Sequence, residues 1–376
     1  MWGVSAMTRE ATVSDQKPSE TAGLQSETAR TAQAVSKSEL LRDLLKQVSR
    51  MFYTTLVIVP ADVRDQVSLA YLFARAADTI ADTDLIDRPS RLDFLSRLKG
   101  QFAGDQIVWE QIQGIQRAVG PLQHDSAERT LLERLDDCFR LFLDFSPDDR
   151  RRVQRVMTTL TQGMEMDLRE FPGQSAEELA VLKTVEDLDR YTYYVAGCVG
   201  EFWTDLMCAH RKGLASWNVH DMSRMGIRFG KGLQLTNIVK DVAHDLRKGR
   251  CYVPEPMLAE VGLTPHDLLD QANLPRFKPV LAKLVRMAVE HLDQGWLYTM
   301  AIPRYETRLR LSCMWPILSA GESLKLALNS PDLLNPAVKV KIPRSKVYQI
   351  LAMTTGTAGC GYAGTAYWGH LRKQIA

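Results

Sequence analysis

The stretch NIVKDVAHD, residues 237–245, is the most informative part of this 376-residue chain, because it places two carboxylates one helical turn apart on a largely apolar segment. Asp241 and Asp245 have the i,i+4 spacing that brings two side chains to the same face of a helix. The stretch YLFARAADTIAD, residues 71–82, repeats this spacing with Asp78 and Asp82. Like charges so spaced weaken a helix by roughly 0.2–0.5 kcal/mol. We call Asp78 and Asp82 the first pair and Asp241 and Asp245 the second pair. Because each pair destabilises its own helix, a favourable interaction outside that helix is expected to compensate for the repulsion.

A divalent cation supplies such a reason. Mg²⁺ binds oxygen ligands, often one or two carboxylates together with phosphate oxygens. A solvated helix face is the alternative, but apolar residues precede both pairs, at 71–74 and 232–236, which places the carboxylates at the edge of a core where an unpaired anion is unfavourable. We expect all four aspartates to be metal ligands, and the two facing pairs to hold a diphosphate through Mg²⁺, with Mn²⁺ as the alternative ion.

Helical periodicity dominates the chain between about residues 39 and 352, and strand-like alternation is scarce. Apolar residues recur at i, i+3 or i+4, and i+7 or i+8, as expected for one buried helix face. Two examples are Leu40, Leu41, Leu44, Leu45 and Val48, and Leu281, Leu284, Val285, Ala288, Val289 and Leu292. The pattern predicts an all-α protein, a bundle of many helices around a central apolar cavity.

Five segments, in this order, resemble the squalene/phytoene synthase family, the head-to-head trans-prenyl transferases, and within it the bacterial squalene synthases. They are residues 48–52, 71–82, 163–167, 191–200 and 234–254. The resemblance covers about residues 40–350 and implies the isoprenoid synthase-type helical bundle. Two departures stand out, because Ala81 and His244 occupy positions where the family usually has Glu. Imidazole suits softer metals better than Mg²⁺.

The resemblance implies a set of substrate contacts around the aspartates. Arg50, Arg75, Lys240 and Arg250 would contact diphosphate, and ion pairing with the same aspartates is the alternative. Lys240 stands where the family usually has Arg, so a bidentate clamp becomes a point charge. The other expected substrate-binding residues are Ser49, Tyr71, Gln234 and Asn237. Tyr191 resembles the family tyrosine near the ionising diphosphate, and a core tyrosine with a bonded hydroxyl is the alternative.

The reductive step depends on a nicotinamide site. Residues 359–364, GCGYAG, match the dinucleotide-binding glycine pattern, but the chain ends twelve residues later without a βαβ unit, so we reject that match. Residues 338–346, VKVKIPRSK, resemble a basic segment of squalene synthases that contributes to NADPH recognition. We therefore expect Lys341 and Arg344 to bind NADPH, and a surface charge run is the alternative.

Composition defines the remaining expectations. Residues 1–38 are polar and lack a secretory signal, so we expect a disordered tail before the helical domain at 39–352. The arginine cluster at residues 150–155 has no nucleic-acid motif beside it, and we assign no nucleic-acid partner. Six cysteines without metal-ligand spacing fit a reducing cytoplasm.

The C-terminal segment 347–369 has no charged side chain, but threonine and glycine dilute it too much for a transmembrane helix. We expect a packed helix and then a loose tail at 353–376, in peripheral contact with a membrane for product release. The protein is expected to be a monomer.

The leading hypothesis is a squalene synthase that joins two farnesyl diphosphates through presqualene diphosphate and reduces the product with NADPH. One alternative is a non-reductive relative that makes phytoene, dehydrosqualene or hydroxysqualene. The other is a helical assembly protein that keeps the fold without catalysis, suggested by Ala81 and His244.

Overall fold

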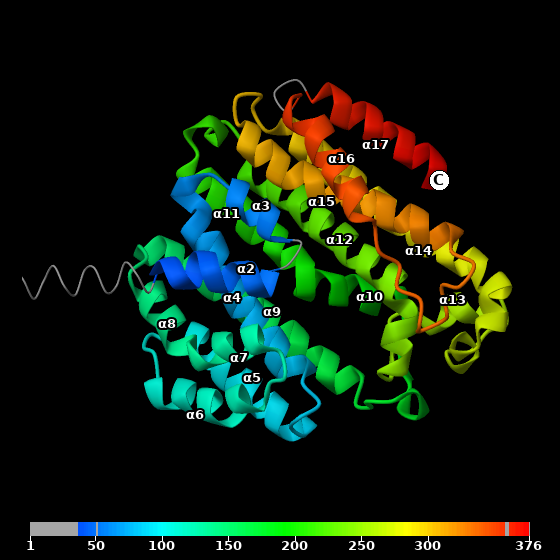
Figure 1. Cartoon of the computed structure of the whole chain (residues 1–376), viewed down its shortest axis with the longest axis horizontal. Coiled ribbons are helices and arrows are strands. Elements are labelled where there is room, and N and C mark those ends of the chain that lie inside the picture. The colour runs from blue at the N-terminus through cyan, green and yellow to red at the C-terminus, as the bar shows by residue number, and fades with distance from the viewer. Residues whose placement is uncertain (1–36, 50–51, 358–360, 376) are drawn as a thin grey trace, which may run out of the picture.

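The computed structural model describes residues 37–49, 52–357 and 361–375, and they are almost entirely helical (Figure 1). The expected disordered tail at residues 1–38 lies outside this part of the chain except for its last two residues, and stays a prediction. The α-helices are α2 (Leu45–Ser49), α3 (Phe52–Ile58), α4 (Ala61–Asp82), α5 (Arg88–Ala103), α6 (Trp109–Val119), α7 (Ser126–Glu133), α8 (Leu135–Leu143), α9 (Pro147–Glu170), α10 (Val185–Thr192), α11 (Cys198–His210), α12 (Val219–Arg247), α13 (Glu255–Ala259), α14 (Leu274–Ala301), α15 (Thr307–Asn329), α16 (Arg344–Thr355) and α17 (Tyr362–Ile375).

Short elements complete the described chain and confirm the all-α prediction. Two π-helical segments are η1 (Glu39–Leu44) and η4 (Tyr193–Gly197), and the 3-10 turns are η2 (Gly120–Leu122), η3 (Ala176–Glu178), η5 (Lys212–Leu214), η6 (His266–Leu269) and η7 (Gln271–Asn273). The strands β1 (Ala180–Val181) and β2 (Arg250–Cys251) pair in parallel and have two residues each.

Helix α12 runs through the middle of the molecule (Figure 1). On one side it packs against α14 and α15, and on the other against α11 and η4. Helices α4 to α9 form the other half of the molecule. Its core contains four phenylalanine rings with centroids 4.7–6.4 Å apart: Phe73, Phe102, Phe139 and Phe142. Ring pairs at these distances prefer tilted and edge-to-face contacts and contribute beyond the area that they bury. This aromatic core supports the helix that carries the first aspartate pair.

Glycines allow the N-terminal half of α12 to approach α11 and η4 closely. A Cβ atom on Gly200 would lie 1.9 Å from the carbonyl oxygen of Gly226, and one on Gly230 would lie 2.3 Å from that of Ala196. No side chain fits in such a gap. The α11–α12 contact is therefore made by backbone against backbone, which fixes the position of α12 and of the second aspartate pair at its C-terminal end.

The turn after α12 depends on a glycine as well. Gly249 has a φ of +76°, in the left-handed region that favours glycine. A Cβ atom there would also lie 2.9 Å from the carbonyl oxygen of Ser175. The chain then enters β2, which pairs with β1 in the register Ala180 with Arg250. This small sheet sets the position from which Arg250 reaches the aspartates.

The C-terminal prediction needs correction. The expected domain boundary at residue 352 falls inside α16, and α17 follows where a loose tail was expected. Trp368, Leu371 and Ile375 of α17 are buried, and the Trp368 indole N–H donates to the Asp293 carboxylate at 3.0 Å. None of the described helices is long and apolar enough to cross a membrane.

The glycine contact gives a stability prediction. Gly200→Ala should lower the free energy of unfolding by about 1–3 kcal/mol, because the added methyl group forces two backbones apart. Urea denaturation measures the change.

Gly100 in α5 is the matched control, because a Cβ atom there meets nothing within 4 Å. Gly100→Ala should raise the free energy of unfolding by about 0.5–1 kcal/mol. Equal stability of Gly200→Ala and the wild type would contradict the packing that places α12.

Candidate functional site

The two aspartate pairs occupy the C-terminal ends of two long helices. Asp82 is the last residue of α4, and Asp245 lies in the last turn of α12. The side chains of Asp78, Asp82 and Asp241 are 43%, 44% and 45% exposed, so each can reach a ligand. Negative charge at a helix C-terminus is disfavoured by the helix dipole. Both pairs therefore sit where a cation is electrostatically favoured.

Arg250 joins the first pair to a third helix. Its Nη1 atom lies 3.1 Å from Oδ1 of Asp82 and 3.2 Å from Oδ2 of Asp167 on α9. The Arg250 side chain is only 16% exposed. Burial lowers the pKa of this guanidinium, but Asp167, Tyr252 and Asp82 outweigh burial and raise it overall. The residue is thus a fixed positive charge between carboxylates.

The carboxylates carry more negative charge than their neighbours neutralise. Burial raises the pKa of Asp78 to about 6, repulsion from Asp82 adds to the rise, and Arg75 opposes it. Burial likewise raises the pKa of Asp245 to about 7, with repulsion from Asp241 outweighing the attraction of Arg250. An added cation would reverse both shifts, because it favours the charged form.

A chain of polar and ring contacts, buried at Asp167 and Tyr252 and exposed at Asn237, connects the site to Tyr191. The Tyr252 hydroxyl donates to Oδ1 of Asp167 at 2.7 Å, and its ring stacks on the Tyr191 ring with centroids 4.6 Å apart. The Gln234 amide donates to the Tyr191 hydroxyl at 3.5 Å and accepts from Asn237 at 3.3 Å. Burial raises the pKa of Tyr191 well above its ordinary value, so the phenol stays protonated.

Two predicted cations pair with the aspartates. Arg75 lies 2.6 Å from Asp78 and also contacts Glu128 on α7, and Lys240 pairs with the adjacent Asp241. The structure thus contains the ion pairs that the sequence left as an alternative to diphosphate contact. The two readings are compatible, because a partly exposed pair exchanges partners at little cost.

The departures from the family pattern differ in their surroundings. Ala81 is buried in the apolar core, and its carbonyl oxygen accepts from Arg91 at 3.1 Å. The His244 side chain is exposed over most of its surface. The part that is covered lowers its pKa, Lys248 and Lys339 lower it further, and Asp241 opposes them.

Other predicted residues are not brought to the aspartates by any described contact. The Ser49 hydroxyl is buried and donates to the Leu45 carbonyl oxygen within its own helix region. Tyr71 is half-buried on α4, near enough to Arg75 to raise its pKa. Lys341 and Arg344 are exposed. Arg50 lies outside the described residues, so its expected role stays a prediction.

Sequence reasoning gave no role to four residues that the structure places here: Asp167, Tyr252, Glu128 and Arg91. Asp167 and Tyr252 lie within segments that carry the family resemblance, and that position was the available signal. Glu128 and Arg91 have no such signal, because their contacts with Arg75 and with the end of α4 depend on folding. Arg91 is buried, and burial together with nearby Arg250 lowers its pKa.

The acidic residues can hold a metal ion only together with ligands from another molecule. Among the described residues, no three carboxylate, imidazole or thiol groups converge on one point that could hold an ion. An all-protein metal cage is therefore absent from this part of the chain. Oxygen donors supplied in pairs suit Mg²⁺ when phosphate oxygens complete the coordination. The donor set thus fits an ion that arrives together with a diphosphate.

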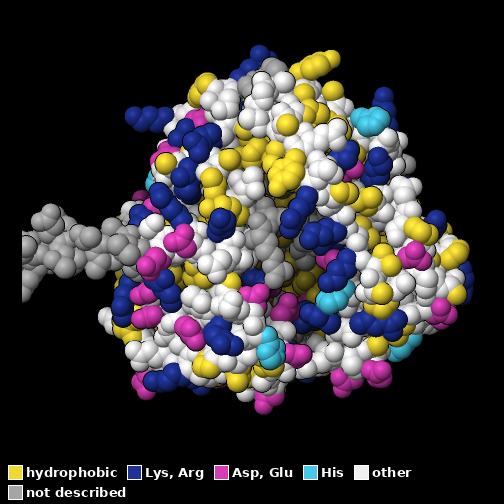
Figure 2. All heavy atoms as spheres, in the orientation of Figure 1, with side chains coloured by type: hydrophobic (Ala, Val, Ile, Leu, Met, Phe, Trp, Pro, Cys, Tyr) yellow, Lys and Arg dark blue, Asp and Glu magenta, His cyan; other side chains and the backbone are white. Residues whose placement is uncertain are grey.

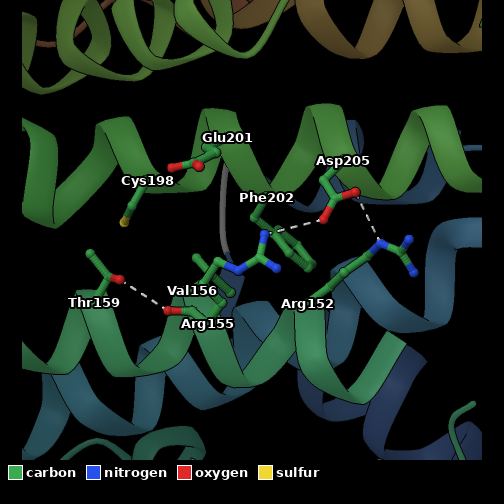
Figure 3. A pocket seen from close by; sticks show the side chains of 8 residues that line it. All are labelled: Arg152, Arg155, Val156, Thr159, Cys198, Glu201, Phe202 and Asp205. Carbon is green, nitrogen blue, oxygen red and sulfur yellow. Dashed lines mark hydrogen bonds and ion pairs between the residues drawn. The ribbon is translucent and has the colours of Figure 1, made fainter. Parts of the chain in front are cut away.

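Figure 2 shows charged side chains of both signs around a hollow near the middle of one face. A separate shallow groove lies between α9 and α11, where Asp205 lies between Arg152 and Arg155 (Figure 3). Thr159 at this groove and Asp167 at the site are eight residues apart on α9, about 12 Å along the helix axis. The groove is therefore distinct from the aspartate site, and the expected central cavity stays a prediction.

Paired carboxylates beside a buried arginine, in a helical bundle, form an acidic site that suits a metal-bound anion. The squalene/phytoene synthase profile matches residues 45–346, and the chain belongs to that family. It is 25% identical over 334 residues to the squalene synthase of Saccharomyces cerevisiae, covering 89% of this chain and 71% of that protein. It is also 25% identical to the 15-cis-phytoene synthase of Synechocystis sp., covering 82% of each.

Solved structures agree with the fold. The complex of TcSQS with the ligand E5700 superposes with a TM-score of 0.72 at 21% identity, covering 90% of this chain and 96% of that one. A dehydrosqualene synthase complex gives a TM-score of 0.59 at 20% identity, covering 88% and 98%. The isoprenoid synthase-type fold is thereby confirmed.

The raised pKa of Asp245 gives a pH-dependent prediction for metal-free protein. The ordinary pKa of Asp is about 4. Between that value and the folded value of about 7, the folded state binds the proton more tightly, so stability falls as pH rises through this window. Asp245→Asn should therefore stabilise the protein more at pH 8 than at pH 5. Chemical denaturation in a chelator measures both differences.

Asp267→Asn is the control. Hydrogen bonds from Thr264 lower the pKa of Asp267, so the charged Asp267 side chain stabilises the folded state fully at both pH values. Asp267→Asn should therefore lower the free energy of unfolding by the same amount at pH 5 and pH 8. A stabilisation by Asp245→Asn that is equal at the two pH values would contradict the electrostatic description of the site.

Proposed function

We propose that the protein is a squalene synthase that joins two farnesyl diphosphates head to head through presqualene diphosphate and then reduces the product with NADPH. One observation carries this proposal: the aspartate pairs of α4 and α12 flank Arg250, with further cations on both helices. That arrangement suits a metal-bound diphosphate better than a neutral ligand, because burial, and after it repulsion between neighbouring aspartates, raises the pKa values of Asp78 and Asp245, and added positive charge opposes both effects.

The residues have distinct tasks in this proposal. Asp78, Asp82, Asp241 and Asp245 would hold Mg²⁺, or Mn²⁺, which supplies positive charge to the leaving diphosphate. Arg75, Lys240 and Arg250 add fixed positive charge at the position where negative charge develops, which is the largest contribution in many enzymes.

Tyr191 would face the allylic cation. Its raised pKa keeps it a neutral phenol, able to donate a hydrogen bond to the departing diphosphate but unable to act as a strong base at neutral pH. Its ring is stacked on Tyr252, and aromatic faces attract cations. Gln234 and Asn237 orient the Tyr191 hydroxyl without supplying a base.

The reductive step is supported by the course of residues 338–346. The positive charge of Lys339 in this segment contributes to the lowered pKa of His244, which lies between Asp241 and Asp245 in the sequence. Lys341 and Arg344 follow on exposed positions, where they could hold the 2′-phosphate of NADPH. NADPH would supply a hydride to the final cation.

Product analysis tests the proposal. Purified protein is incubated with farnesyl diphosphate and Mg²⁺, with and without NADPH, and the hydrocarbon is identified. Squalene that forms only with NADPH is expected. An unreduced C30 product with or without NADPH would move the protein to the non-reductive branch, and no turnover of any prenyl diphosphate would favour a non-catalytic role.

Asp78→Asn and Asp241→Asn should each lower turnover at least about a hundredfold, because each removes a charged donor from the diphosphate site. Folding stability should not fall, because each change relieves repulsion within one helical turn. Steady-state kinetics and thermal unfolding measure the two effects. Asp93→Asn is the control, an exposed aspartate of α5 that pairs with Arg97 on the surface. Activity within threefold of wild type in either site variant sinks the assignment.

Lys341→Gln/Arg344→Gln should weaken apparent NADPH affinity at least about tenfold, the effect of one lost charge-assisted hydrogen bond. Presqualene diphosphate should accumulate while squalene falls, because the first coupling needs no nicotinamide. The charge-matched control is Arg224→Gln/Lys278→Gln, which removes two exposed cations outside the segment. Unchanged NADPH dependence in the first double variant would refute this cofactor site.

A further inference from the structure

Asp167 is a buried carboxylate on α9 with two different partners, one for each oxygen. Oδ1 accepts the Tyr252 hydroxyl at 2.7 Å, and Oδ2 lies 3.2 Å from Nη1 of Arg250. Both partners belong to the segment that follows the turn at Gly249. One side chain of α9 therefore fixes two side chains of a different element, at the point where that element meets the aspartates.

The two carboxylates that contact Arg250 differ in burial. The Asp82 side chain is 44% exposed, whereas the Asp167 side chain is 10% exposed. An exposed ion pair exchanges readily with other ligands, whereas removing one member of a buried pair leaves an uncompensated charge. Asp82 can therefore turn to a metal ion while Asp167 keeps Arg250 in place.

Tyr252, the second partner of Asp167, in turn contacts Tyr191. The Tyr252 ring lies between two aromatic neighbours, with centroid distances of 4.6 Å to Tyr191 and 4.9 Å to Phe171. Its hydroxyl donates to Asp167, and a side-chain hydrogen bond between Tyr252 and Tyr191 opposes the rise in the pKa of Tyr191. Fixing that hydroxyl fixes the plane on which Tyr191 stacks.

We propose that Asp167 is a positioning residue: it holds Arg250 toward the diphosphate and, through Tyr252, holds the ring of Tyr191. This inference rests on the proposed function, since it takes a metal-bound diphosphate as the ligand. Asp167 does not itself touch the substrate, and it acts through Arg250 and Tyr252.

Binding of inorganic pyrophosphate in the presence of Mg²⁺, measured by calorimetry on the full chain, tests the Arg250 arm. Asp167→Asn keeps the shape and an acceptor for Tyr252 but removes the charge that holds Arg250. Affinity should fall at least about tenfold, the effect of one lost charge-assisted hydrogen bond. In an Arg250→Gln background the same change should have less than about a twofold effect, because the partner is gone.

Glu165→Gln is the matched control. Glu165 lies on the same helix two residues away, its side chain is 4% exposed, and it pairs with Lys99 at 2.6 Å. This variant also loses a buried ion pair, so its unfolding temperature should fall by an amount similar to that of Asp167→Asn. Its pyrophosphate affinity should stay within about twofold of wild type, because Glu165 and Lys99 contact neither Arg250 nor Tyr252 in any described interaction.

Tyr252→Phe separates the second arm. It should lower kcat with farnesyl diphosphate by a larger factor than it lowers pyrophosphate affinity, because Asp167 still pairs with Arg250 while the hydroxyl that helps to hold Tyr191 is gone.

Three outcomes overturn the inference: pyrophosphate affinity of Asp167→Asn within threefold of wild type, an equal loss in the Arg250→Gln background, or an equal loss in Glu165→Gln. In each of them wild-type protein still binds pyrophosphate, so the proposed function stands. Failure of the wild type to bind pyrophosphate with Mg²⁺ would instead refute the proposed function, and this inference with it.

Discussion

Repulsion among carboxylates is the constraint on which the rest of the site depends. Asp78 and Asp245 both have raised pKa values, because burial and a neighbouring aspartate disfavour their charge. The nearby cations lessen this repulsion without removing it. Added positive charge would favour the charged form of both carboxylates. The proposed metal-bound diphosphate would supply that charge.

Backbone packing keeps that repulsion from opening the structure. Helices α11 and α12 approach through Gly200, Gly226 and Gly230, where no side chain fits between the backbones. At the other end of α12, Gly249 turns the chain into β2 and delivers Arg250 to Asp82 and Asp167. Backbone contacts outside the site therefore hold the aspartates close together against their electrostatic repulsion.

The helical fold and the identity of the acidic pairs could be predicted from the sequence, because apolar periodicity and i,i+4 spacing are local properties. The roles of Asp167, Tyr252 and Glu128 could not, because their partners lie 83, 85 and 53 residues away in the chain: Arg250, Asp167 and Arg75 respectively. The C-terminal helix α17 was missed for a different reason. Its buried face consists of Trp368, Leu371 and Ile375, too few residues to stand out among the glycines and threonines before them.

In the proposed function the two aspartate pairs hold metal together with a diphosphate and do not form a metal cage by themselves. Titration of Mn²⁺ followed by electron paramagnetic resonance, with and without inorganic pyrophosphate, tests this claim most directly. We predict weak Mn²⁺ binding to the protein alone, because no three described ligand groups converge, and tight binding once pyrophosphate is present. Tight Mn²⁺ binding without pyrophosphate, or no strengthening when it is added, would contradict the account.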